Sequence, residues 1–137
     1  PLLELVQAVE TIINPMVFDV VYTHSKKDLN VDHRVVHDAG MTVFRPVADQ
    51  KVRSMFAFET LSATHWYDSG GVFSPQRFVD VTSFWKQKMQ ALEAYGPELH
   101  HFPHARSREA VLAMARFRGC LAGRKKAEAF EILRMVE

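Results

Sequence analysis

The sequence "MVFDVVYTHSKKDLNVDHRVVHDAGMTVF", residues 16–44, carries the clearest structural signal in this 137-residue chain. Its first nine residues are almost continuously apolar and rich in β-branched and aromatic side chains, which predicts a strand covered on both faces. From Val31 to Phe44 the pattern is helical, and Arg45-Pro46 ends it. A strand followed by a helix predicts a βα unit, whose polar strand end, Thr23-His24, is where such sheets present ligands.

Similar signals extend in both directions from this unit. Apolar residues at helical spacing predict a helix over residues 2–13, which Asn14-Pro15 ends. A strand is expected at 53–60, followed by a Ser/Thr/Gly-rich connection from Leu61 to Pro75. Two further helices are expected, one capped by Thr82 or Ser83 and running to Tyr95, the other capped by Ser107 and running from Arg108 to about Leu121. Residues 127–136 fit either a strand or a helix.

The alternation of strands and helices predicts a single α/β domain over residues 1–137, with a mostly parallel sheet and flanking helices. Its composition, 47% hydrophobic and 24% charged, is that of a globular protein. The net charge of +1 gives no electrostatic reason to expect a nucleic-acid partner. Because no segment has the pattern of a membrane span or a signal peptide, and the single Cys120 cannot form an internal disulfide, we expect a cytoplasmic location.

Residues 23–37 contain three His and two Asp directly after the predicted strand. A neutral imidazole is a common metal ligand, and a neighbouring carboxylate can orient the ring or transfer a proton, so Asp32-His33 is a candidate site pair. His33 and His37 are four residues apart and lie on one face of the predicted helix. The alternative interpretation is structural, since an Asp in a first helical turn also stabilises the helix dipole.

A second group of candidate residues, His101, His104, Arg106 and Arg108, lies in and directly after the predicted loop of residues 100–107. Arg can clamp an anionic or polyhydroxylated ligand, although solvated loops have the same composition. Glu59 lies at the end of a predicted strand, where either a site carboxylate or a structural hydrogen-bonding group is expected. No G-x-G-x-x-G, Walker A or G-x-S-x-G motif occurs.

Several separated blocks together resemble the LmbE-like, or PIG-L-like, zinc-dependent N-deacetylases. They are "FDVVYTHSKKDLNVDHRVVHDA", "FRP", "FAFE", "FVDVTSFWKQKMQALEAYGPEL", "FPHARS" and "AEAFEIL", in order and at similar spacing along nearly the whole chain. The resemblance implies a Rossmann-like fold and removal of the acetyl group from an N-acetylglucosamine-type amide. The implied partner is therefore a small N-acetylated sugar conjugate.

The same resemblance implies roles for individual residues. Family members hold zinc through a His and an Asp of an N-terminal A-H-P-D-D-E block and a His of a later H-x-D-H block. Residues 30–33, N-V-D-H, are similar to the later block, so His33 is the implied Zn²⁺ ligand. Asp32 is then expected to orient a His or the metal shell, and His37 or His24 to stabilise the oxyanion or protonate the departing amine. Sugar-contacting roles are expected for Asn30, Glu59, His104 and Arg106.

This chain departs from the family pattern at two points. It contains no H-P-D-D, so two zinc ligands and the expected general base are absent, and the domain is expected to be incomplete on its N-terminal side. Asn30 also stands where the first His of H-x-D-H is expected. The alternative is therefore a non-catalytic remnant, or a subunit whose metal site another segment completes, with self-association into a homo-oligomer through an exposed sheet edge.

Overall fold

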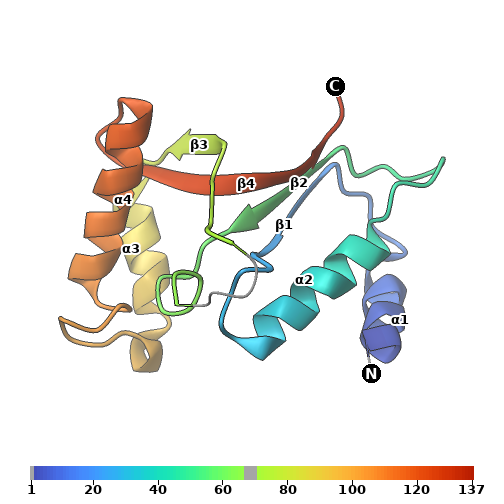
Figure 1. Cartoon of the computed structure of the whole chain (residues 1–137), viewed down its shortest axis with the longest axis horizontal. Helices are drawn as coiled ribbons and strands as arrows, with labels where there is room; N and C mark the ends of the chain where they lie inside the picture. The colour runs from blue at the N-terminus through green and yellow to red at the C-terminus, as the bar shows by residue number, and fades with distance from the viewer. Residues whose placement is uncertain (1, 67–70) are drawn as a thin grey trace. The chain divides into compact units, whose positions relative to one another are not determined.

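The computed structural model describes residues 2–66 and 71–137. Along the described chain the elements are α1 (Leu2–Ile13), β1 (Val20–His24), α2 (Val31–Val43), β2 (Ser54–Phe58), β3 (Arg77–Asp80), α3 (Trp85–Glu93), the 3-10 turn η1 (Gly96–Glu98), α4 (Arg108–Ala122) and β4 (Ala127–Met135) (Figure 1). The predicted α/β class with flanking helices is confirmed. The expected connection from Leu61 to Pro75 includes residues 67–70, which lie outside the described residues.

The strands form one sheet in the order β1-β2-β4-β3. β1 and β2 are parallel, in register from Val20↔Ser54 to His24↔Phe58, whereas β3 and β4 are antiparallel. The predicted parallel pairing thus holds for the βα unit of residues 20–58, and the sheet as a whole is mixed. The chain divides into two compact units, residues 1–74 with 131–137 and residues 75–130, and β4 runs from the second into the first.

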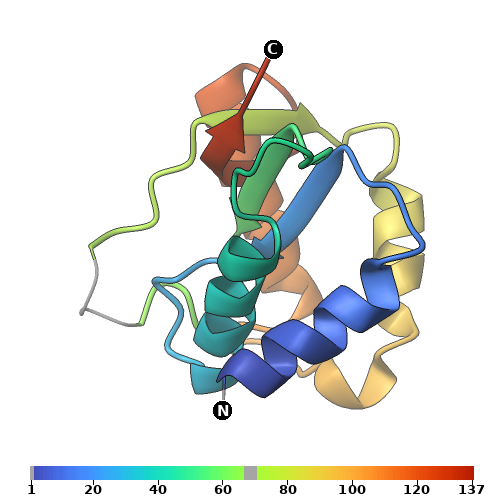
Figure 2. The ribbon, with the colours of Figure 1, turned by 90° about the vertical axis from the view of Figure 1, so that its right-hand side faces the viewer.

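The core of the first unit lies between its two helices. Val6 of α1 is buried against Ala39 and Val43 of α2, and Figure 2 shows the two helices side by side. The apolar stripe predicted for residues 2–13 therefore packs against the helix that follows β1. In the sheet of this unit, Met55 of β2 is fully buried.

The expectation that both faces of β1 are covered is wrong. α2 covers the Thr23 face, where a Cβ built on Gly40 would lie 3.7 Å from the Thr23 hydroxyl. Val20 and Tyr22 point the other way and are 40% and 47% exposed. β1 is an edge strand of the described sheet, so it has a neighbouring strand on one side only. Its apolar sequence had predicted more complete burial.

In the second unit, the predicted helix over residues 108–121 is confirmed. The Ser107 hydroxyl accepts a hydrogen bond from the Ala110 N–H at the start of α4, and Gly123 at φ 64° ends the helix in the left-handed conformation. The predicted cap of α3 is wrong, because Phe84 occupies the cap position and no side chain caps the helix. The Thr82 hydroxyl instead accepts a hydrogen bond from the Lys126 N–H, next to β4.

Residues 127–136, which the sequence left open, form a strand over Ala127–Met135. Among the described residues, no helix combines the length and the apolar composition that crossing a membrane requires.

Candidate metal centre

The segment between β1 and α2 is shaped by side chains that bind nearby backbone groups. The Ser25 hydroxyl accepts from the Lys27 N–H at 3.2 Å, and the Asp28 carboxylate accepts from the Asn30 N–H at 3.0 Å. The Asn30 side chain then accepts from the Asp32 N–H at 2.9 Å and caps α2. These are the turns and caps that Ser, Asp and Asn favour, so this local geometry follows from the sequence.

His33, in the first turn of α2, meets a carboxylate that the sequence did not single out. Its Nδ1 lies 2.9 Å from Oδ2 of Asp28, a fully buried residue. Donation from Nδ1–H to the carboxylate leaves the ring lone pair on Nε2, which is how a carboxylate orients a metal-binding His. Asp28 is thus placed to perform the role expected for Asp32, which was to orient a His.

Asp28 has further polar neighbours in the described structure. The Thr64 hydroxyl lies 3.3 Å from Oδ2, and the same hydroxyl accepts from the Thr60 N–H at 2.7 Å. With the Asn30 N–H on Oδ1, both carboxylate oxygens have hydrogen-bond partners. This network compensates the burial of the charge and fixes the direction of the carboxylate.

His24, the last residue of β1, lies against His33. The two rings stack with centroids 3.9 Å apart and planes inclined by 14°. Burial lowers the pKa of the His24 imidazole below its ordinary value, and a charge on His33 lowers it further, while Asp28 acts in the opposite direction. His24 is therefore held in the neutral form, which is the form that binds metal ions.

The residues present fit a metal ion. One potential ligand atom from each of His24, Asp28 and His33 can be chosen so that all three lie within 4.8 Å of one another. Nδ1 of His24 is buried and has no hydrogen-bond partner in the described part of the chain. A buried ring nitrogen without a partner is costly, and a metal ion would supply one.

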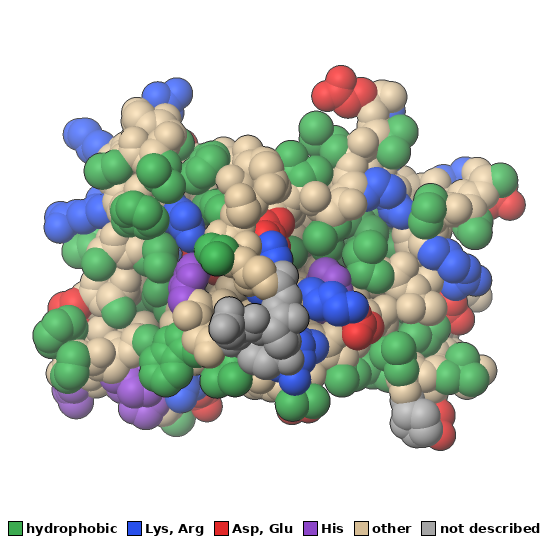
Figure 3. Space-filling model, in the orientation of Figure 1, with side chains coloured by type: hydrophobic (Ala, Val, Ile, Leu, Met, Phe, Trp, Pro, Cys, Tyr) green, Lys and Arg blue, Asp and Glu red, His purple; other side chains and the backbone are tan. Residues whose placement is uncertain are grey.

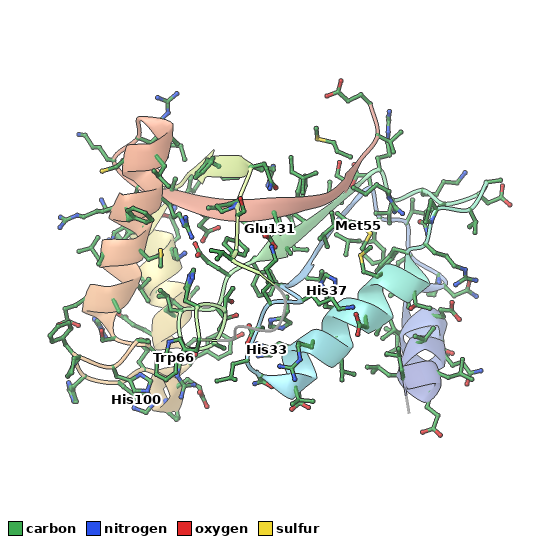
Figure 4. All side chains as sticks on the ribbon, in the orientation of Figure 1. His33, His37, Met55, Trp66, His100 and Glu131 are labelled. Atoms are coloured by element: carbon green, nitrogen blue, oxygen red, sulfur yellow. The ribbon has the colours of Figure 1, made fainter. Side chains whose placement is uncertain are left out.

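His37 lies one turn after His33 on α2, as the spacing predicted, and Figure 4 shows both side chains on that helix. His37 is buried, and its Nδ1 donates to the backbone oxygen of His24 at 2.8 Å. This contact ties the end of β1 to α2 and leaves the lone pair of His37 on Nε2.

The other predicted site residues of the first unit lie near the ends of elements. Asp32 is exposed in the first turn of α2, and Asn30 caps the same helix. Glu59 follows β2 directly, as expected, and its Oε2 lies 2.9 Å from Nε2 of His65.

His104 and Arg106 belong to the second unit and form a polar cluster there. Arg106 forms an ion pair with Glu98, its Nη2 lies 3.3 Å from Nε2 of His100, and its backbone N–H donates to Nδ1 of His104 at 3.0 Å. Burial, followed by the charges on His100 and Arg106, lowers the pKa of His104. An adjoining hollow of about 260 Å³ is lined by Glu93, Gly96, Leu99, His100, His101, Arg108 and Glu109.

Neither a family model nor any curated protein sequence matches this chain. Its fold is similar to solved structures. One is the conserved protein TT1542 from Thermus thermophilus, with a TM-score of 0.69, 21% identity, and alignment over 99% of this chain and 59% of that one.

Two others are complexes of a deacetylase in the biosynthesis pathway of teicoplanin, one described as with bog and one with teicoplanin. Both have a TM-score of 0.69 and 99% coverage of this chain, at 20% and 19% identity, and cover 54% and 51% of the matched chains. The present chain thus spans just over half the length of these structures, and at this identity the likeness establishes the fold.

Proposed function

We propose that this chain is part of a zinc-dependent hydrolase of the LmbE-like, or PIG-L-like, kind, which removes the acetyl group from an N-acetylglucosamine-type amide. The observation that carries the proposal is the unpartnered, buried Nδ1 of His24 beside the ring of His33, at the carboxyl end of a strand. The similarity in fold to a deacetylase supports the same reaction class.

His24 and His33 would hold the zinc through ring nitrogens, with Asp28 either as a third ligand or as the group that orients His33. A bound Zn²⁺ supplies polarisation of the acetyl carbonyl and a nucleophilic water near neutral pH. Zinc rather than calcium or magnesium is favoured because two of the three donors are imidazoles.

The remaining groups would bind the substrate and move protons. His37, with its lone pair on Nε2, can accept a proton and return it to the departing amine. Asp32, in the first turn of α2, is proposed to orient the metal shell. Sugar hydroxyl contacts are proposed for the Asn30 amide and Glu59 in the first unit, and separately for His104 and Arg106 in the second, because all four carry hydrogen-bonding groups suited to a polyhydroxylated ligand.

A second candidate function follows from the state of Asp28. Both of its oxygens already have hydrogen-bond partners, which compete with a metal ion for them. If Asp28 does not bind the metal, the cluster offers only two metal ligands, His24 and His33. A catalytic zinc site normally has three protein ligands. In this alternative the chain supplies one wall of a metal site that another segment or subunit completes.

Zinc stoichiometry tests the proposal. After dialysis against zinc, elemental analysis is expected to find about one tightly held ion per chain. The His33→Ala variant should lose it, whereas His101→Ala, which removes a His of the second unit, should retain it. Acetate release from an N-acetylglucosamine derivative is measured on the same samples.

Equal zinc content in the His33→Ala and unaltered chains would overturn the ligand assignment. Weak zinc binding that is lost in His33→Ala, without acetate release, would favour the second candidate function.

A further inference from the structure

Glu131 of β4 is a charged side chain that the proposed chemistry does not use. It is 9% exposed, and its Oε1 lies 2.5 Å from Nζ of Lys27 and accepts from the Ser74 N–H at 2.8 Å. The Ser25 hydroxyl lies 3.4 Å from Oε2. A buried carboxylate is tolerated only when such contacts compensate its lost hydration, so this arrangement is specific and costly to disturb.

Two of the three contacts come from the turn between β1 and α2. Ser25, which is fully buried, also accepts from the Lys27 N–H through its hydroxyl and from the Asp28 N–H through its backbone oxygen. Lys27 in addition donates to the backbone oxygen of Val72 at 2.8 Å. Figure 4 shows Glu131 on β4, the strand that carries this carboxylate to the turn.

The turn joins the members of the candidate metal centre. His24 precedes Ser25, and Asp28, which binds His33, follows Lys27 directly. A shift of Ser25 or Lys27 would therefore move the Asp28 carboxylate relative to the His33 ring.

We infer that Lys27 and Glu131 are positioning residues: their ion pair holds the Ser25–Asp28 turn so that Asp28 stays bonded to His33. They touch neither a metal nor a substrate and act through the turn. The use of this geometry for zinc rests on the proposed function, whereas the positioning itself is a property of the metal-free chain.

A purely stabilising ion pair would give a different result from a positioning pair. Replacing both members of a buried pair by apolar residues often restores stability. The Lys27→Met/Glu131→Leu variant should therefore regain the free energy of unfolding lost in Glu131→Gln or Lys27→Met. It cannot restore the directional bonds to Ser25, Val72 and the Ser74 N–H, so the turn should remain loose.

Amide hydrogen exchange in the metal-free chain is the deciding measurement. The Asp28 N–H donates to the Ser25 oxygen and the Asn30 N–H to Asp28, so both amides report on the turn. In all three variants we expect these amides to exchange about tenfold faster or more, as expected for loss of a charge-assisted hydrogen bond. The ¹⁵N shifts of the His33 ring should move in parallel.

The matched control is Glu128→Gln. Glu128 lies on the same strand and pairs with Lys88 at 2.5 Å, in the second unit and away from the turn. Loss of this ion pair should leave the hydrogen-exchange rates of the Asp28 and Asn30 amides unchanged. Unchanged exchange in the double apolar variant, with stability restored, would overturn the inference and leave a purely stabilising pair.

Zinc titration of the same variants separates this inference from the proposed function. If the function holds, the zinc affinity of the double variant should fall about tenfold or more, the usual effect of losing a residue that supports a metal ligand. If the unaltered chain binds no zinc, the proposed function fails, and the exchange comparison still decides whether Lys27 and Glu131 position the turn.

Discussion

At the scale of single residues, hydroxyl groups with the same local sequence signal behave differently. The Ser107 hydroxyl caps α4 by accepting a hydrogen bond from the Ala110 N–H, only three residues further along the chain. The Thr82 hydroxyl, equally plausible as a cap, binds the backbone of Lys126 instead. Caps are predictable from sequence when their partner is local, and unpredictable when a distant strand offers another partner.

The first prediction concerns this cap. Ser107→Ala should lower the free energy of unfolding by about 1 kcal/mol, because it leaves an N–H at the start of α4 without its acceptor. The matched control is Ser83→Ala, an exposed serine before a helix that no side chain caps, which should have little effect. Urea denaturation followed by circular dichroism measures both, and equal losses would contradict the assignment.

The second prediction concerns the pH titration of His104. Its pKa is lowered by burial and by the charges on His100 and Arg106, so the ring should be less than half protonated at a pH where an ordinary His is half protonated. Arg106→Gln removes one positive charge and should raise this pKa, while keeping the backbone N–H that binds Nδ1.

NMR titration of the imidazole protons measures the shift. Arg108→Gln is the control, since Arg108 forms an ion pair with Glu93 and does not contribute to the lowered pKa. A pKa of His104 that is unchanged in Arg106→Gln would contradict the contribution of Arg106 and leave burial and the charge on His100 as the causes of the lowered pKa.

At the scale of elements, the close approach of α4 to the chain that follows it requires a glycine in the helix, which the sequence pattern did not reveal. A Cβ on Gly119 of α4 would lie 2.6 Å from the backbone oxygen of Arg124 and 3.0 Å from the backbones of Lys125 and Lys126. The chain leaving α4 therefore folds back across the helix, and only glycine allows this approach. A helical glycine usually lowers the expected helix propensity, yet here it permits the return into β4.

Gly119→Ala is accordingly our third prediction. The added methyl group meets backbone, which cannot rotate away, so the free energy of unfolding should fall by about 1–3 kcal/mol. The control is Gly96→Ala, where the built Cβ has no heavy atom within 4 Å. If Gly119→Ala were as stable as Gly96→Ala, the close approach of α4 to residues 124–126 would be wrong.

At the scale of the whole chain, the sequence predicted where helices and strands lie better than it predicted which strand faces are exposed. Local periodicity in the sequence correctly predicted the first helix and the βα unit, which the structure shows as α1, β1 and α2. Local periodicity could not predict the exposure of Val20 and Tyr22, because that exposure depends on β1 lying at the edge of the described sheet. The partner of His33 was missed as well, although Asp28 lies only five residues away, because the sequence pattern does not show how the Ser25–Asp28 turn directs this carboxylate toward the His33 ring.

The fourth prediction follows from this edge. Exposed apolar side chains remain on the surface (Figure 3), and those on an edge strand favour pairing between copies. Sedimentation is expected to show concentration-dependent association that Val20→Lys reduces. Leu121→Lys removes an exposed apolar side chain from a helix instead and should not reduce it; equal effects would point to non-specific apolar contact.

The contact between Lys27 and Glu131 also bears on the order in which the molecule is built. The two residues are 104 positions apart, so a nascent chain presents β1, the turn and α2 long before the ribosome adds the carboxylate that fixes them. Joining such distant segments is slow, because chain entropy is lost before the contact forms. The contact between Asp28 and His33 would therefore acquire its final geometry near the end of folding, after β4 has joined the turn.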